Sequence, residues 1–222
     1  MLTIKGVLFF HNTPVFYSVM PKCDSPEATR IKKGKIMRKN FGAKALLYPM
    51  PVFIIGAYTE DGTPNAMNAA WGGISEETEI SICISEDHKT TECILKRGAF
   101  TVSIADCENV VSADYVGIAS GNDTPDKIAR AGWHAEKSEF VDAPLFYELP
   151  MALECRLKSY DAETCRLVGE IVNVSADERI LGENGKIDLS KFHPITYDPV
   201  GHTYRPLGEP IGHAFSDGLK LK

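Results

Sequence analysis

The feature that most limits how this chain can fold is a long apolar strand followed at once by a tight turn. Residues Val52–Tyr58 form a continuous apolar run, which is typical of a strand buried on both faces. Asp61-Gly62 follows as a strong hairpin signal, and Pro64–Trp71 returns as the partner strand. A strand covered on both sides favours a sheet that closes on itself.

The later segments repeat the strand pattern. Residues Glu79–Ser85 alternate strictly, with Ile80, Ile82 and Ile84 on one face. The same alternation recurs at residues 100–104 and 153–157, and residues 167–174 return across a turn at 161–164. Strands joined by hairpins pair antiparallel. The sequence therefore predicts a mainly β fold, a small closed or half-open barrel, although an isolated sheet with one wet face would also fit the alternation.

Three helices interrupt the strands, and their ends follow from capping and breaking residues. The predicted helices are about 91–97, ended by Gly98; about 108–119, after an N-cap at Asp106; and a third that Thr124 caps, Pro125 enters and Gly132 ends.

Composition narrows the classes of function. Apolar residues make up 44% of the 222 residues, which suits a packed domain, and the net charge is −6. No basic stripe exists that could follow a nucleic acid backbone, and no apolar run is long enough to span a membrane. We expect a cytoplasmic protein with one domain over residues 37–222 and an N-terminal extension over residues 1–36, which is either flexible or packed on a partner subunit.

The cysteines and histidines do not indicate a metal site. None of the six cysteines forms a Cys-x-x-Cys pair, and no histidine pair has metal spacing. Counting residues back from the turn at 161–164 puts Cys155 opposite about Glu170 and Cys165 opposite Tyr160. The two thiols then do not face each other, and reduced, structural cysteines are expected.

The turn and helix start within residues 85–104 suggest an anion site. Lys89, Thr90 and Thr91 stand where the first free backbone N–H groups of a helix point outward. A cation and two hydroxyls beside those donors make a phosphate seat. The alternative is a capped surface helix with a solvated Lys89.

At this point the chain resembles a known family. The carrying motifs, in order, are PVFIIGAYTEDGTPNAMNAAWGGIS, KTTECILKRGAFTVSI, SADYVGIASGNDTPDKIARAG, ELPMALECRL, LVGEIVNV and YRPLGEPIGHAF. Over residues 41–215 the chain is similar to the flavin reductase-like proteins with the FMN-binding split-barrel fold, in particular the flavoredoxin branch. The resemblance implies an antiparallel split β-barrel of Greek-key type with a few peripheral helices, and a homodimer with FMN in the cleft between subunits.

The resemblance also implies which residues bind the cofactor. It implies that one strand lies beside the flavin ring, that a turn holds the phosphate, and that a loop and one residue of the C-terminal tail lie near the cofactor. In this sequence these are Met67, Asn68, Ala69 and Ala70; Ser85, His88, Lys89 and Thr90; Ser120, Gly121 and Lys127; and Tyr204.

The implied function is an FMN-dependent oxidoreductase, either an NAD(P)H-dependent flavin reductase or a flavoredoxin-type electron transfer protein. The alternatives are a flavin-binding carrier or module without its own nicotinamide-dependent activity, and a non-flavin protein that reuses the barrel. Expected partners are flavin, nicotinamide and a redox protein. Because the ring performs the electron chemistry, no protein nucleophile is required, and we find no catalytic triad.

Structural explanations compete for several of these residues. Asn68 could be a turn or bulge residue, and Lys127 could form a surface ion pair. Beside Tyr204, His202 could contact substrate or fill an interface. Trp71 is expected in the core or in the dimer interface. Many related reductases carry Asn where this chain has Ser103, which leaves the polar contact at that position open.

Overall fold

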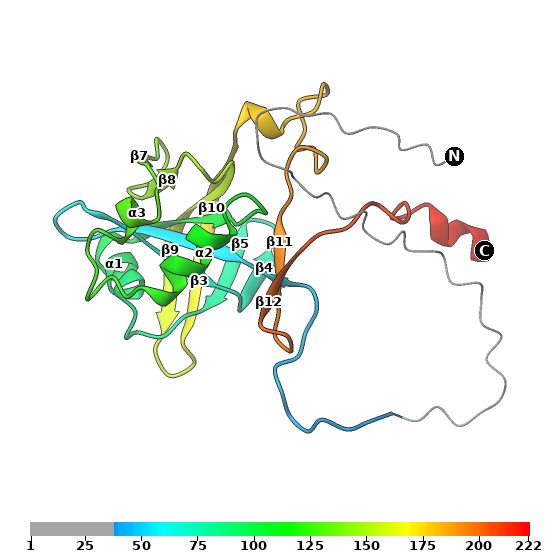
Figure 1. Ribbon diagram of the computed structural model, residues 1–222, viewed down its shortest axis with the longest axis horizontal. Coiled ribbons are helices and arrows are strands. Elements are labelled where there is room, and N and C mark those ends of the chain that lie inside the picture. The colour runs from blue at the N-terminus through cyan, green and yellow to red at the C-terminus, as the bar shows by residue number, and fades with distance from the viewer. Residues whose placement is uncertain (1–37) are drawn as a thin grey trace, which may run out of the picture. The chain divides into compact units, whose positions relative to one another are not determined.

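A computed structural model describes residues 38–222 (Figure 1). The predicted extension, residues 1–36, lies outside the described residues, as does the predicted domain start at Met37. Residues Lys44–Lys222 form one compact unit. No helix in the described part of the chain is both long enough and apolar enough to cross a membrane.

The unit is built on one antiparallel sheet of seven strands, which confirms the predicted fold class. Its spatial order is β3-β2-β6-β9-β10-β5-β4. The strands are β2 (Phe53–Tyr58), β3 (Pro64–Ala69), β4 (Gly72–Glu76), β5 (Glu79–Cys83), β6 (Ala99–Ile104), β9 (Met151–Asp161) and β10 (Arg166–Ala176).

This sheet curls into a barrel-like shape. Its two edge strands, β3 and β4, follow each other in the chain and are separated by Ala70 and Trp71 alone. A flat sheet of seven strands would hold its edges many strand widths apart, because neighbouring strands are about 4.8 Å apart. The short link therefore requires the sheet to bend round. Gly72 begins β4 where an added Cβ would lie 2.8 Å from the backbone oxygen of Ser81.

Strand β2 is buried on both faces, as predicted. Phe53 and Ile55 belong to an inner core that also holds Ile80, Ile82 and Phe100. Neighbouring positions of the strand face an outer core that the helices cover. The alternation of side chains along a strand explains this division.

Two smaller sheets and three helices complete the unit. β1 (Met50–Pro51), β11 (Ile195–Asp198) and β12 (Thr203–Pro206) form one small sheet; β7 (Ala135–Lys137) and β8 (Pro144–Phe146) form the other. The helices are α1 (Lys89–Arg97), α2 (Val110–Ile118) and α3 (Lys127–Arg130), with 3-10 turns η1 (Glu178–Ile180) and η2 (Asp217–Leu221). α1 packs on β2 and β3, and α2 packs on β3.

The helix boundaries differ from prediction in two places. The third helix was predicted from Thr124 but begins at Lys127 and has four residues. The backbone N–H of Thr124 bonds back to the carbonyl of Ser120, so the preceding residues form a loop. The second helix begins at Val110; the Asp106 carboxylate accepts the N–H groups of Glu108 and Asn109 just before it.

The predicted register of the β9–β10 hairpin is also wrong, by one residue at Cys155 and by two at Tyr160. Cys155 pairs with Ile171 and not with Glu170, and Tyr160 pairs with Leu167. Two irregularities shift the register along this hairpin. The conclusion holds nonetheless, since all five cysteines of residues 38–222 are free.

Candidate functional site

The edge strand β3 organises the candidate site. Asn65 and Asn68 stand three residues apart on it, and side chains at that spacing point to opposite faces of a strand. β3 pairs with β2 on one side, and no strand of the described chain pairs with its other side. One row of its backbone groups is therefore open to partners other than a strand. A pocket lies beside each of the two asparagines.

The first pocket lies where the β2–β3 turn meets the start of α1, and we call it the turn pocket. Its volume is about 470 Å³, within the range of about 300–1,000 Å³ usual for small-ligand sites. It is lined by Thr59, Glu60, Asp61, Thr63, Pro64, Asn65, Lys89, Gly121 and Pro125.

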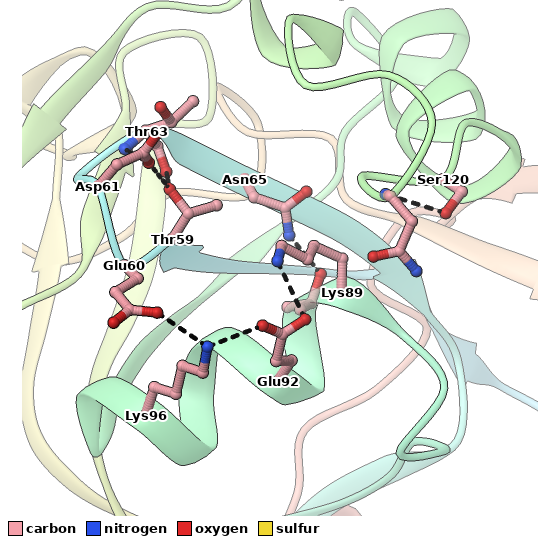
Figure 2. Close-up of polar contacts among 11 residues, drawn as sticks. Thr59, Glu60, Asp61, Thr63, Asn65, Lys89, Glu92, Lys96 and Ser120 are labelled. Carbon is pink, nitrogen blue, oxygen red and sulfur yellow. Dashed lines mark hydrogen bonds and ion pairs between the residues drawn. The ribbon is translucent and has the colours of Figure 1, made fainter.

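A row of alternating charges borders the turn pocket, and Figure 2 shows it running from the turn along α1. Lys89 Nζ lies 3.0 Å from Glu92, which is also 3.1 Å from Lys96 Nζ, and Lys96 Nζ lies 2.9 Å from Glu60. Hydrogen bonds from Lys89 and then Lys96 lower the pKa of Glu92. Because Glu92 has two cations, Lys89 can turn to a ligand while Glu92 stays paired.

The start of α1 keeps its backbone donors available. His88 is the N-cap residue, and its side chain makes no capping hydrogen bond. Thr90 does not cap the helix: its buried hydroxyl accepts from Asn65 Nδ2 at 2.7 Å. Thr91 donates to the carbonyl of Ser85 at 2.7 Å and so closes the preceding turn. The two threonines thus hold the helix start in place beside Lys89.

The second pocket lies on the other face of β3, between α2 and β12, and we call it the tyrosine pocket. Its volume is about 410 Å³. It is lined by Asn68, Ala69, Ala70, Asp114, Gly117, Ile118, Tyr197, His202 and Tyr204.

Tyr204 is the best anchored side chain of the tyrosine pocket. Its hydroxyl donates to Asp114 Oδ1 at 2.8 Å and accepts from Asn68 Nδ2 at 3.4 Å. Burial, together with the hydrogen bond to Asp114, raises the pKa of Tyr204 to about 12. The phenol therefore remains protonated at neutral pH. Beside it, the Tyr197 hydroxyl and His202 Nδ1 lie 2.9 Å apart.

The end of α2 and the loop after it approach β3 closely at both pockets. A Cβ added at Gly117 would lie 2.9 Å from the Cβ of Asn68, and one added at Gly121 would clash with Asn65 Oδ1. Only glycine allows the chain to approach β3 this closely at both points.

The structure divides the predicted site residues into three groups. Lys89 and Gly121 line the turn pocket, where Thr90 acts through Asn65. Asn68, Ala69, Ala70 and Tyr204 line the tyrosine pocket. The remaining five, which line neither pocket, are Met67, Ser85, His88, Ser120 and Lys127.

Each of these five has its own surroundings. Met67 packs against the inner core, and His88 is exposed at the start of α1. The Ser85 carbonyl accepts from Thr91, and the Ser120 hydroxyl accepts the Asn122 N–H at 3.2 Å (Figure 2).

Lys127 forms no surface ion pair, because it is 97% buried. Its Nζ donates to the carbonyls of Ala119 at 2.9 Å and Val116 at 3.3 Å, at the end of α2. Burial lowers the pKa of Lys127 to about 8. Trp71, expected in the core or an interface, is 56% exposed in the single chain.

Sequence reasoning missed two residues that the geometry makes central, Asn65 and Asp114. Asn65 could have been found from the sequence, because an asparagine three residues before Asn68 must point to the opposite face of the same strand. Asp114 carried none, because its role depends on a tyrosine 90 residues further along the chain.

Ser103 is the one buried side chain of the described residues whose polar atom has no hydrogen-bond partner. It lies on β6 opposite Ile54 and Ala152, and it lines neither pocket. Among the described residues, no three His, Cys, Asp or Glu side chains are grouped to hold a metal ion.

Comparison with known proteins gives consistent matches. Residues 45–201 match the family model described as a flavin reductase like domain. The chain is 40% identical to the flavoredoxin of Desulfovibrio vulgaris (Miyazaki F), with a TM-score of 0.78, over 82% of this chain and 100% of that one. It is 26% identical to a flavoredoxin from Methanosarcina acetivorans, with a TM-score of 0.75, over 84% and 100%.

A more distant match shows the fold alone. The FMN-binding domain of a flavin reductases-like enzyme from Shewanella baltica OS155 is 19% identical, with a TM-score of 0.65, over 73% of this chain and 88% of that one.

Proposed function

This chain belongs to the flavin reductase-like family, and from that membership we propose that it is an FMN-binding oxidoreductase that takes its electrons from NADH or NADPH. The observation that carries the proposal is the start of α1. There an uncapped helix N-terminus and Lys89 border a pocket beside the open edge of β3.

The residues present fit the chemistry of FMN. A phosphate needs N–H donors and a cation, which the first turn of α1 and Lys89 supply. The carboxylates that share the turn pocket are already engaged: Glu60 binds Lys96, and Asp61 accepts from Thr59 and Thr63. A flat ring with alternating donors and acceptors suits the small side chains and open backbone edge of β3.

The chain's own residues would position the cofactor and set its electrostatics. Bound FMN supplies hydride acceptance and onward electron transfer. Lys89 and the α1 amides would hold the phosphate end. Ala69 and Ala70 would leave room for the ring edge, while Asn68 and Tyr204 contribute polar groups in the tyrosine pocket.

A second candidate, an electron carrier without its own nicotinamide site, is favoured by one specific observation. The 40%-identical structure is a flavoredoxin that this chain covers completely. In this version a redox protein, rather than NADH or NADPH, reduces the bound flavin.

We propose a homodimer in the cytoplasm as part of the same function. Strand β4 ends the sheet, and no strand of the described residues pairs with its outer edge. Trp71 just before β4 and Ile74 on it are 56% and 65% exposed. Exposed apolar side chains on an open strand edge are typical of association surfaces. The five free cysteines of the described chain suit a reducing compartment.

The test is an anaerobic titration of purified protein loaded with FMN. Addition of NADH or NADPH should bleach the oxidised flavin absorption of the protein. If the flavin stays oxidised with both nicotinamides but is reduced by ferredoxin, the protein is an electron carrier and not a nicotinamide-dependent reductase. Absence of FMN binding, measured by fluorescence and by thermal stabilisation, would overturn both versions.

A further inference from the structure

The hydrogen-bonding direction of Asn68 is fixed by its neighbours. One amide group of this side chain lies 3.0 Å from the backbone carbonyl oxygen of Ala113. A carbonyl oxygen can only accept, so the atom facing it must be the NH2 group. The orientation of the Asn68 amide therefore follows from chemistry.

The second amide hydrogen of Asn68 is directed at Tyr204, whose own proton is committed elsewhere. The Asp114 carboxylate can only accept, and it takes the Tyr204 proton at 2.8 Å. The pKa of Tyr204, raised to about 12, keeps that proton in place. Tyr204 thus presents a lone pair to Asn68 Nδ2 at 3.4 Å.

Both amide hydrogens of Asn68 are consequently used within the protein. The carbonyl oxygen, Oδ1, receives no hydrogen bond from any residue of the described chain. Asn68 lines the tyrosine pocket, so this oxygen is the polar atom that the side chain can offer to a ligand.

From this we infer that the tyrosine pocket recognises its ligand through an N–H donor, an imide or a primary carboxamide, bound to Asn68 Oδ1. Asp114 is a positioning residue that acts through Tyr204. The inference deepens the proposed function and rests on it, because the flavin ring carries an imide N–H and nicotinamide carries a carboxamide. Ligands that offer only acceptors at this point are excluded.

Binding of matched ligands separates the two sources of the N–H group. One arm compares FMN with 3-methyl-FMN, which lacks the imide hydrogen. The other arm compares NADH with its reduced 3-acetylpyridine analogue, which lacks the carboxamide. A lost hydrogen bond should weaken binding about three- to tenfold in the arm whose ligand faces Asn68.

Variants connect the discrimination to these residues. Asn68→Leu should bring the ratio of dissociation constants in that arm close to one. Asp114→Asn and Tyr204→Phe keep the Asn68 bond to the Ala113 carbonyl but disturb the second contact of its amide, so they should lower the ratio by less than Asn68→Leu does. Tyr160→Phe, which removes a hydroxyl bonded to the carbonyl of Ile84, is the matched control and should leave the ratio unchanged.

The outcomes distinguish the two levels of the proposal. Discrimination in one arm that is lost in Asn68→Leu supports the inference. FMN binding to the wild-type protein without discrimination in either arm overturns it and leaves the proposed function intact. Absence of FMN binding would refute the proposed function instead.

Discussion

At the scale of single residues, the shared ion pair of Glu92 is the basis for a test of the phosphate site. Lys89→Gln should weaken FMN binding by about ten- to hundredfold, because a charge-assisted contact is worth about 1.5–3 kcal/mol. Riboflavin, which has no phosphate, should lose little. Fluorescence titration of both flavins gives the two dissociation constants.

The control for this prediction is a lysine away from the turn pocket. Lys158→Gln on β9 also removes a lysine paired with a glutamate, Glu79, and neither of these two residues lines the turn pocket. Lys158→Gln should leave the ratio of the two flavin affinities unchanged. Equal losses of FMN and riboflavin in Lys89→Gln would show that the phosphate binds elsewhere.

Lys127 gives a pH-dependent prediction. Burial lowers its folded pKa from 10.5 to about 8. Between these values the unfolded chain holds a proton that the folded chain has released, so the contribution of Lys127 to the free energy of unfolding rises with pH. Urea unfolding at about pH 7.5 and about pH 9.5 should show the wild-type protein gaining stability relative to Lys127→Met. A difference independent of pH would contradict this.

The candidate site was predictable at this scale only in part. Lys89 was predicted because a cation at a helix start suggests an anion site, and Lys89 does line a pocket in the structure. The partners were not readable. Thr90 bonds to a residue 25 positions away and Tyr204 to one 90 positions away, and such pairings depend on the tertiary fold.

At the scale of elements, the end of α1 offers a clean comparison of two glycines. Gly98 ends the helix with φ +67°, a left-handed conformation that costs other residues about 1–2 kcal/mol. Alanine also reduces the entropy of the unfolded chain, which offsets part of this strain. Gly98→Ala should therefore lower the free energy of unfolding by about 1 kcal/mol. Urea denaturation measures the change.

Gly73, on β4, is the matched position. An added Cβ would meet no atom within 4 Å at either glycine, but Gly73 does not have a positive φ. Gly73→Ala should therefore leave stability unchanged or slightly raised. Similar losses at both positions would show that backbone strain is not the cause.

Elements with strong local signals were predicted, and those set by tertiary contacts were not. β2, β5 and α1 have clear periodicity or caps, and the structure confirms them. β11 and β12 were not predicted, because their short sequences become strands only by pairing with each other and with β1. The third helix exists, but its start was misplaced because Thr124 lies in a loop packed against β3.

At the scale of the whole molecule, the proposed homodimer is testable through β4. Sedimentation equilibrium should give twice the 24.4 kDa chain mass for the wild-type protein. Ile74→Lys should shift it toward monomer, because an inserted charge opposes burial of this face. Leu95→Lys, at a 45% exposed position on α1, is the control and should remain dimeric. A wild-type monomer at all concentrations would refute the proposal.

The overall architecture followed from two kinds of signal in the chain. Hairpin turns implied antiparallel pairing, and the doubly buried β2 implied a curved rather than a flat sheet. The way the sheet closes was not predictable, since nothing in the residues around Ala70 and Trp71 states that β3 and β4 lie at opposite edges.

That connection has a mechanical consequence. An open sheet can fray from either side, one outer strand at a time, while the centre survives. Here the two edge strands, β3 and β4, are joined by only two residues, so a displacement of one edge strand also displaces the other. The amide protons of β3 and β4 should consequently exchange with solvent in one cooperative opening, and not through separate fraying of each edge.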